Sequence, residues 1–212
     1  MISHKHKFIF IHMPKCAGTS IERALYNYAS DISDIISESE MCERHKKWFI
    51  ATKNLRNEHL FNSIDNHVDY FKFTFCRNPY DRLVSTYKFF KLAERGSTFS
   101  SFIKNTKLFE KVNSILDRGL CLDTNFEYHL LPGVYFIKHG VDFVGRFENL
   151  QEDFDTVCDK IGIPRPKLPH IIKTNHKQHY TQYYDDETRE IVAERYAEDI
   201  EYFGYKFEEN EL

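Results

Sequence analysis

The chain has 212 residues, of which 42% are hydrophobic and 29% are charged, and its formal net charge is −3. This length is sufficient for one domain with a substantial core, so we expect a single domain over residues 1–212, with residues 1–7 as a mobile N-terminus. The small net charge argues against a protein that binds nucleic acids or membrane surfaces in general.

The sequence shows neither a membrane-span pattern nor a signal-peptide pattern. No segment approaches the roughly 20 apolar residues of a membrane span, and the apolar run Phe8–Ile11 is too short for a signal peptide. The five cysteines are odd in number and lack paired spacing, and Cys76 and Cys158 stand in apolar patterns typical of buried thiols. We therefore expect a reduced, cytoplasmic protein.

The first unit predicted along the chain consists of a strand, a tight loop and a helix. The apolar run Phe8–Ile11 is followed by Lys15, Gly18, Thr19 and Ser20, and a helical pattern then continues to residue 28. The free N–H groups and the dipole of a helix N-terminus attract anions, the lysine adds positive charge, and glycine permits close approach to the backbone. This junction predicts a phosphate-binding loop. The lysine precedes the glycine, unlike the order in the phosphate loop of ATPases.

A second strand, loop and helix follows at residues 70–90. Residues 70–76 form an aromatic, β-favouring run, Asn78 is a suitable N-cap, and Pro79 suits the first helical position. Arg77 falls at the carboxyl end of the strand and Ser85 falls about two turns into the helix. Arginine offers a planar fork of donors suited to phosphate, so we expect both side chains to face one ligand.

These motifs are also compatible with purely structural roles that involve no phosphate. Lys15 is also compatible with an ordinary surface turn, and Arg77 with a helix cap or an ion pair to Asp81. Cys16 lies where a helix N-terminus lowers a thiol pKa, although we interpret it as a bystander in any chemistry.

The remaining patterns indicate an α/β protein. Phe99–Leu116 predicts one or two helices, Val134–Ile137 and Val141–Phe147 predict short strands, and Leu150–Ile161 and Asp185–Phe203 predict helices. Strands that alternate with helices imply a central parallel sheet flanked by helices, with ligands at the carboxyl ends of the strands. Both predicted phosphate motifs fall at that edge.

Both motifs resemble those of sulfotransferases that use 3′-phosphoadenosine 5′-phosphosulfate (PAPS). The run from Pro14 to Ser20 resembles their 5′-phosphosulfate loop, and the run from Arg77 to Ser85 resembles their 3′-phosphate motif. Residues 144–150 and 199–207 extend the likeness to the carbohydrate sulfotransferase family (sulfotransferase family 2) and its small bacterial relatives. The resemblance spans about residues 8–207 and is weak over 30–66 and 92–136.

This resemblance implies a P-loop-NTPase-like sulfotransferase fold and transfer of a sulfuryl group from PAPS to an acceptor hydroxyl, with a sugar or glycan as the acceptor and no metal ion. Lys15 would stabilise the leaving oxygen, and Arg77 with Ser85 would hold the 3′-phosphate. The nucleotide-binding residues it implies are Lys15, Cys16, Ala17, Gly18, Thr19, Ser20, Arg77 and Ser85. The basic segment 173–180 adds Lys177 as a candidate nucleotide contact, and a solvated surface loop stays open as the alternative.

A general base must accept the proton of the acceptor, and the sequence departs from the family where relatives place a histidine. His45, just upstream of that point, is the first candidate. His59, His67 and Glu22 are weaker candidates, and His12 is interpreted as structural.

Two alternatives to sulfuryl transfer remain. One is an ATP-dependent kinase with a divergent phosphate loop, in which the pair Arg77 and Ser85 would have no role because ATP lacks a 3′-phosphate. The other is a catalytically inactive module that binds the nucleotide. The sequence does not identify the acceptor or the oligomeric state.

Overall fold

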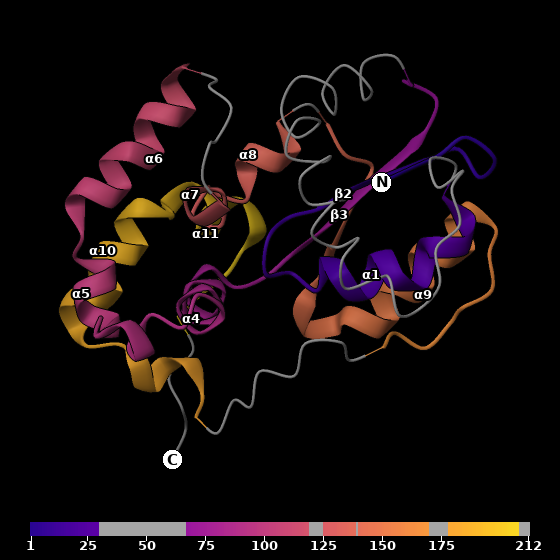
Figure 1. The fold of residues 1–212 in the computed structure, drawn as a ribbon. Coiled ribbons are helices and arrows are strands. Elements are labelled where there is room, and N and C mark those ends of the chain that lie inside the picture. Colours follow the sequence, from indigo (N-terminus) through magenta and orange to yellow (C-terminus); the bar gives the residue numbers. More distant parts are fainter. Residues whose placement is uncertain (30–66, 119–124, 139, 170–177, 208–212) are drawn as a thin grey trace.

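The structure is a computed structural model that describes residues 1–29, 67–118, 125–138, 140–169 and 178–207. Figure 1 shows strands β2 and β3 at the centre with helices around them. The strands are β1 (Ile2–Ser3), β2 (Phe8–Ile11), β3 (Phe71–Cys76) and β4 (Phe143–Arg146). The α-helices are α1 (Gly18–Leu25), α4 (Pro79–Phe89), α5 (Phe99–Ile103), α6 (Thr106–Arg118), α7 (Asn125–Tyr128), α8 (Val134–Ile137), α9 (Leu150–Ile161), α10 (Asp186–Arg195) and α11 (Ala197–Phe203). Short 3₁₀ turns are η1 (Tyr26–Tyr28), η2 (Ala93–Arg95), η3 (Phe147–Asn149) and η4 (Tyr180–Tyr183).

The strands form one sheet in the order β1-β2-β3-β4, which confirms the predicted α/β fold with a mostly parallel sheet. The pairs β2–β3 and β3–β4 are parallel, and β1 is antiparallel to β2. Residues 1–7, expected to be mobile, contribute β1 to this sheet, and the Met1 ammonium donates to the Phe10 carbonyl at 2.9 Å. A two-residue strand is too short to leave a periodic pattern in the sequence.

Aromatic side chains fill the sheet core because a parallel sheet is covered on both faces. All of β2 is buried, and Phe10 stacks on Phe73 with ring centroids 5.2 Å apart. Gly145 of β4 lies against the Phe75 ring, where a Cβ atom would not fit. The glycine is therefore a packing requirement of the strand.

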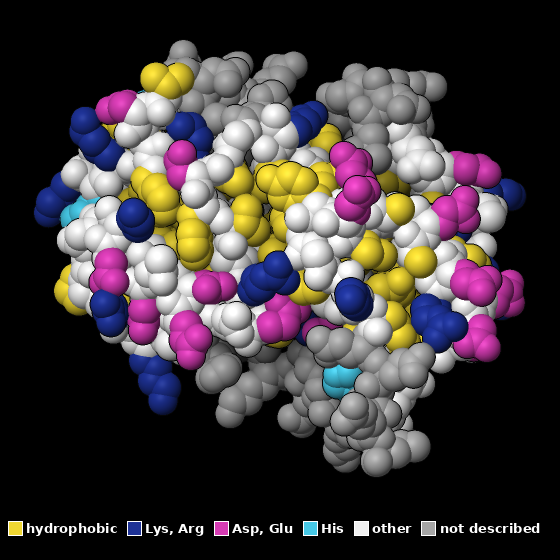
Figure 2. Space-filling model, turned by 180° about the vertical axis from the view of Figure 1, so that it is seen from behind, with side chains coloured by type: hydrophobic (Ala, Val, Ile, Leu, Met, Phe, Trp, Pro, Cys, Tyr) yellow, Lys and Arg dark blue, Asp and Glu magenta, His cyan; other side chains and the backbone are white. Residues whose placement is uncertain are grey.

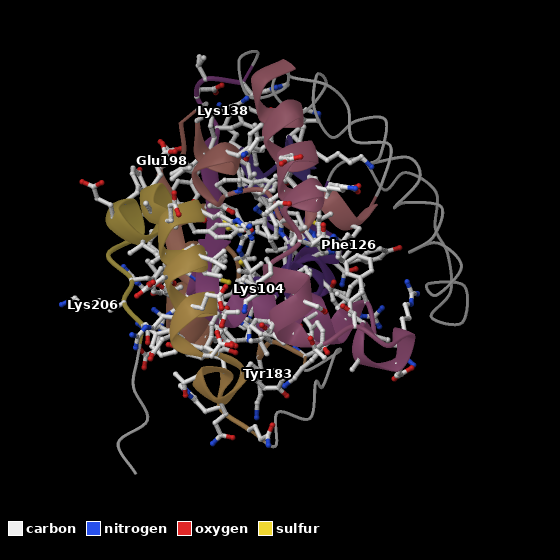
Figure 3. All side chains as sticks on the ribbon, turned by 90° about the vertical axis from the view of Figure 1, so that its left-hand side faces the viewer. Lys104, Phe126, Lys138, Tyr183, Glu198 and Lys206 are labelled. Atoms are coloured by element: carbon white, nitrogen blue, oxygen red, sulfur yellow. The ribbon has the colours of Figure 1, made fainter. Side chains whose placement is uncertain are left out.

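Helices cover the sheet on either side of the two phosphate motifs. Helix α9 packs on β3 and β4, whereas α10 packs on α4 and α5. Lys104, at the end of α5, contacts Glu187 of α10 at 2.5 Å, and Figure 3 shows Lys104 where these helices meet. On the face seen in Figure 2, basic and acidic side chains are interspersed, as the small net charge suggests.

The predicted strand at Val134–Ile137 is wrong, because this segment is helix α8. The backbone N–H groups of Gly133 and Val134 donate to the two carboxylate oxygens of Asp199 at 2.6 and 2.9 Å. A carboxylate at a helix N-terminus satisfies donors that the helix itself leaves unpaired. Asp199 comes from a distant part of the chain, so the local β-favouring residues did not reveal it. The predicted helix at 185–203 is also divided, at Tyr196, into α10 and α11.

Asp199→Ala should destabilise the fold. Its carboxylate lies 3.6 Å from Arg82 Nη2, and both side chains are 2% exposed. Removing it leaves a buried guanidinium without its counter-charge and two helix N–H groups without an acceptor, so we expect the free energy of unfolding to fall by about 3 kcal/mol. Urea denaturation measures this change. The exposed neighbour Glu198 is the control, since Glu198→Ala should change stability by no more than about 0.5 kcal/mol.

Candidate functional site

The predicted phosphate loop joins β2 to α1, as the sequence indicated. Lys15 and Ala17 have positive φ angles of 66° and 62°, although neither is glycine. Ala17 is the N-cap residue of α1, and its carbonyl accepts from Ser20 N at 2.9 Å. Left-handed residues of this kind cost roughly 1–2 kcal/mol each, and they turn successive backbone N–H groups toward one side. The loop thus has the backbone form of an anion site.

The space beside Gly18 is occupied by the His12 side chain. A Cβ atom at position 18 would lie 2.5 Å from His12 Nε2, because the imidazole occupies the space of the missing side chain. His12 Nδ1 in turn lies 2.7 Å from Glu22 Oε1. The imidazole therefore connects the end of β2 to the start of α1.

Gly18→Ala should lower both stability and affinity for a bound anion. Forcing a methyl group against the imidazole costs about 1–3 kcal/mol unless the ring moves. Thermal unfolding and nucleotide titration measure the two effects. In a His12→Ala background the same change should cost at least 1 kcal/mol less, since the double-mutant cycle isolates the contact. An unchanged cost there would contradict the packing explanation.

The Lys15 ammonium lies over the Phe89 ring, 3.7 Å from its centroid. Phe89 is 42% exposed, an unusual value for a large hydrophobic residue of this protein. Burial, together with the nearby Arg77 charge, lowers the pKa of Lys15 from 10.5 to about 8. The ammonium is thus partly desolvated and held beside the loop, where it can interact strongly with a negatively charged oxygen.

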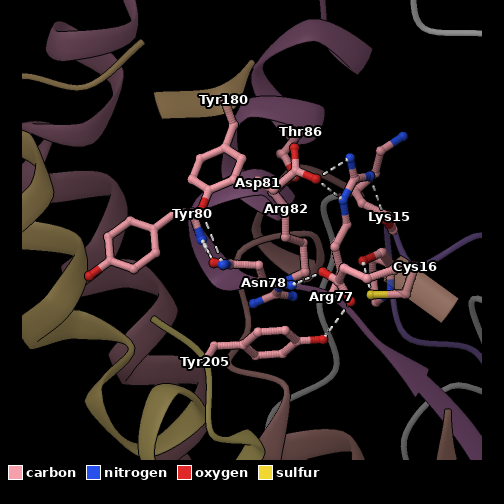
Figure 4. A network of polar contacts seen from close by, with 12 residues as sticks. Lys15, Cys16, Arg77, Asn78, Tyr80, Asp81, Arg82, Thr86, Tyr180 and Tyr205 are labelled. Atoms are coloured by element: carbon pink, nitrogen blue, oxygen red, sulfur yellow. Dashed lines mark hydrogen bonds and ion pairs between the residues drawn. The ribbon is translucent and has the colours of Figure 1, made fainter. Parts of the chain in front are cut away.

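Arg77 connects the two predicted phosphate motifs (Figure 4). Its Nη1 donates to the Lys15 carbonyl at 3.1 Å and its Nε donates to Asp81 Oδ2 at 2.8 Å, while Nη2 forms an ion pair with the same oxygen at 2.7 Å. The guanidinium also lies 3.9 Å from the centroid of the Phe147 ring. The sequence left open an ion pair between Arg77 and Asp81 as a purely structural role for Arg77. The structure contains this ion pair, and it lies beside the predicted phosphate loop.

Helix α4 begins as expected, with Asn78 as N-cap and Pro79 at the first position. Asn78 Oδ1 accepts from Tyr80 N at 3.1 Å, and its Nδ2 donates to the Lys206 carbonyl at 2.9 Å. Ser85 is buried on this helix one turn beyond Asp81, so both residues lie on the same side of it. The structure thus brings Arg77, Ser85 and the Lys15 loop to one edge of the sheet.

A partly buried polar network next to Arg77 was not predicted from the sequence. Glu148 Oε1 accepts from Asn78 N at 3.0 Å, and its Oε2 accepts from Tyr205 OH at 2.9 Å. Tyr180 OH lies 3.3 Å from Asn78 Nδ2. These contacts join the C-terminal part of the chain to the start of α4 and fix the backbone next to Arg77.

The cysteine thiols are buried and free at positions 16, 76 and 158, which confirms the prediction for Cys76 and Cys158. The suggestion that the helix N-terminus lowers the Cys16 pKa is wrong. Burial raises the pKa of Cys16 to about 12, and its Sγ lies 3.5 Å from the Pro14 carbonyl. Cys16 therefore contributes packing and backbone to the loop and no thiolate.

The candidate general bases lie in different places relative to the predicted site. His45, His59 and Lys177, the last a predicted nucleotide contact, lie outside the described residues. His67 lies beside Tyr70 at the amino end of β3, whereas Arg77 follows its carboxyl end. Since β3 is about 20 Å long, His67 belongs to the opposite edge of the sheet. Glu22 pairs with His12, a contact that neither the helix pattern nor residue spacing indicated.

The fold is α/β, and the loop with the backbone form of an anion site lies at the carboxyl edge of the parallel strands. A profile of the sulfotransferase family matches residues 1–206. The chain belongs to this sulfotransferase family. No helix of the described segments is long and apolar enough to cross a membrane.

Several curated proteins are similar to the chain. An uncharacterized protein of Archaeoglobus fulgidus is 32% identical over 97 residues, covering 45% of this chain and 70% of that protein. Carbohydrate sulfotransferase 14 of Mus musculus is 24% identical over 190 residues, covering 81% and 47%. Carbohydrate sulfotransferase 10 of Gallus gallus is 23% identical over 242 residues, covering 97% and 66%. The chain thus spans about half to two thirds of the length of these two enzymes. No solved structure matches the chain.

Proposed function

We propose that the chain transfers a sulfuryl group from PAPS to a hydroxyl group of a sugar or glycan. The observation that carries this proposal is the hydrogen bond from Arg77 Nη1 to the Lys15 carbonyl, because it places the two phosphate motifs of a sulfotransferase-family chain in direct contact. A nucleotide with phosphates at both its 5′ and 3′ positions matches two adjacent anion sites.

The residues present fit such a nucleotide. The left-handed positions at Lys15 and Ala17 turn N–H groups toward a 5′-phosphosulfate, with hydroxyl groups at Thr19 and Ser20. Arg77 and Ser85 are the proposed partners of the 3′-phosphate. Lys177, which lies outside the described residues, stays a predicted contact of the nucleotide.

PAPS, when bound, supplies a sulfuryl group on a phosphate leaving group. Lys15 would donate a hydrogen bond to the bridging oxygen, where negative charge develops as its bond to sulfur breaks. The acceptor oxygen forms the new bond to sulfur and releases its proton to a base, for which His45 stays the proposed residue. As in phosphoryl transfer, positioning and charge stabilisation carry most of the rate acceleration.

The acceptor class rests on the relatives. Two of them are named carbohydrate sulfotransferases, so a sugar or glycan hydroxyl is the proposed acceptor. A cytoplasmic location is proposed only from the cysteine pattern of the sequence.

Calorimetric titration with adenosine 3′,5′-bisphosphate tests the proposal, with adenosine 5′-phosphate and ATP as controls and no magnesium. We expect clear preference for the bisphosphate, followed by PAPS-dependent sulfation in a screen of sugar acceptors. Preference for ATP that requires magnesium would favour the kinase alternative. Bisphosphate binding without turnover across the acceptor screen would favour the inactive nucleotide-binding module.

The Lys15 pKa predicts the alkaline limb of the pH profile. The protonated ammonium is the active form, and its pKa in the free protein is lowered to about 8, so kcat/KM should fall as pH rises through about 8. Rates in buffers from pH 6 to 10 measure this. Lys15→Arg should be slower but should lose this limb, since arginine stays charged throughout that range. An unchanged limb in Lys15→Arg would assign it to another group.

A further inference from the structure

The contacts of Arg77 leave specific donors available. A guanidinium has five N–H groups, and Arg77 donates one from Nε to Asp81 and one from Nη1 to the Lys15 carbonyl, while Nη2 forms an ion pair with Asp81. Within the described part of the chain, at least one N–H on each terminal nitrogen therefore remains for a ligand. The side chain is only 5% exposed, so its orientation is set by these partners and by the Phe147 ring.

Asp81 has two opposite effects on an anion at this site. Its negative charge lies beside the proposed 3′-phosphate position and repels it. Its Oδ2 atom also accepts a hydrogen bond from Nε and pairs with Nη2 along one edge of the guanidinium, which holds the group in a single orientation. The sign of the net effect distinguishes a simple neighbouring charge from a residue that positions Arg77.

We propose that Asp81 is a positioning residue, which holds Arg77 so that its remaining N–H groups face the 3′-phosphate while Nη1 stays on the Lys15 carbonyl. This inference rests on the proposed function. Lys15 has a left-handed backbone with φ of 66°, and the Arg77 bond helps to hold that conformation. Asp81 thereby links the 3′-phosphate subsite to the residue proposed to stabilise the leaving oxygen.

The decisive measurement is the affinity of Asp81→Ala for adenosine 3′,5′-bisphosphate. Although the change removes a negative charge from an anion site, we expect binding to weaken about tenfold, because Arg77 loses its fixed orientation. The affinity for adenosine 5′-phosphate should fall less, so the selectivity for the 3′-phosphate falls too. Unchanged or tighter bisphosphate binding would overturn the proposal.

Glu94→Ala is the matched control. Glu94 follows α4, pairs with Lys91 on the surface at 3.3 Å, and gives the same change in net charge. We expect its bisphosphate affinity to stay within about twofold of that of the unmodified protein. Thermal unfolding of each variant verifies folding, and Asp81→Asn, which keeps one acceptor oxygen, serves if the alanine variant does not fold. The Asp81→Asn variant should lose part of the affinity for the bisphosphate. Bisphosphate binding at or above the level of the unmodified protein would again overturn the proposal.

A double-mutant cycle tests whether Asp81 acts through Arg77. In an Arg77→Ala background, Asp81→Ala should not weaken bisphosphate binding further, and the loss of repulsion should leave it equal or slightly tighter. A further tenfold loss there would overturn the positioning role. If the unmodified protein shows no preference for the bisphosphate over adenosine 5′-phosphate, the proposed function fails before the Asp81 question arises.

Discussion

Lys15→Ala is expected to abolish sulfuryl transfer while the protein stays folded. Removing one group that stabilises developing negative charge typically costs about 10²–10³ in kcat, so we expect a loss of at least about 100-fold. The Lys15 side chain ends on a partly exposed ring, so no buried core is lost with it. Single-turnover rates with saturating PAPS, alongside thermal unfolding, measure the two quantities.

Lys138→Ala is the control for this variant. Lys138 also lies over an aromatic ring, 4.3 Å from the Tyr135 centroid, and it is exposed at the end of α8. Its removal should leave turnover within about twofold, as expected for a surface substitution. Undiminished turnover in Lys15→Ala would remove Lys15 from the proposed chemistry.

Arg77→Ala is expected to weaken binding of adenosine 3′,5′-bisphosphate by about 100-fold, since two charge-assisted hydrogen bonds are lost. Binding of adenosine 5′-phosphate should weaken less. It should still weaken, because Arg77 also holds the Lys15 carbonyl of the phosphosulfate loop. Parallel titrations with the two nucleotides give both losses.

Arg165→Ala is the matched control for Arg77. Arg165 also contacts an aspartate through Nε and Nη2, here the two oxygens of Asp159 at 2.8 and 2.7 Å, but on the surface of the protein. Its removal should affect neither nucleotide. Equal losses for the two nucleotides in Arg77→Ala would assign Arg77 to the loop alone and not to the 3′-phosphate.

The two phosphate motifs were predictable because their signals are local. A strand that ends at a Pro-Lys turn, and an Asn-Pro helix start, are each written in a few consecutive residues. Parallel pairing of β2, β3 and β4 then brings their carboxyl ends to one edge. The sequence alone thus determined the fold class and the order of the motifs. It also placed Lys15, Arg77 and Ser85 at the same edge of the sheet.

Contacts between distant residues were decided only by the tertiary structure. The hydrogen bond from Arg77 to Lys15 joins residues 62 positions apart, and the carboxylate that begins α8 comes from Asp199. The pairing of His12 with Glu22 depends on the path of the loop between them. A side chain's partner across the fold leaves no periodic or propensity signal, because the energy of such a contact depends on where packing places both groups.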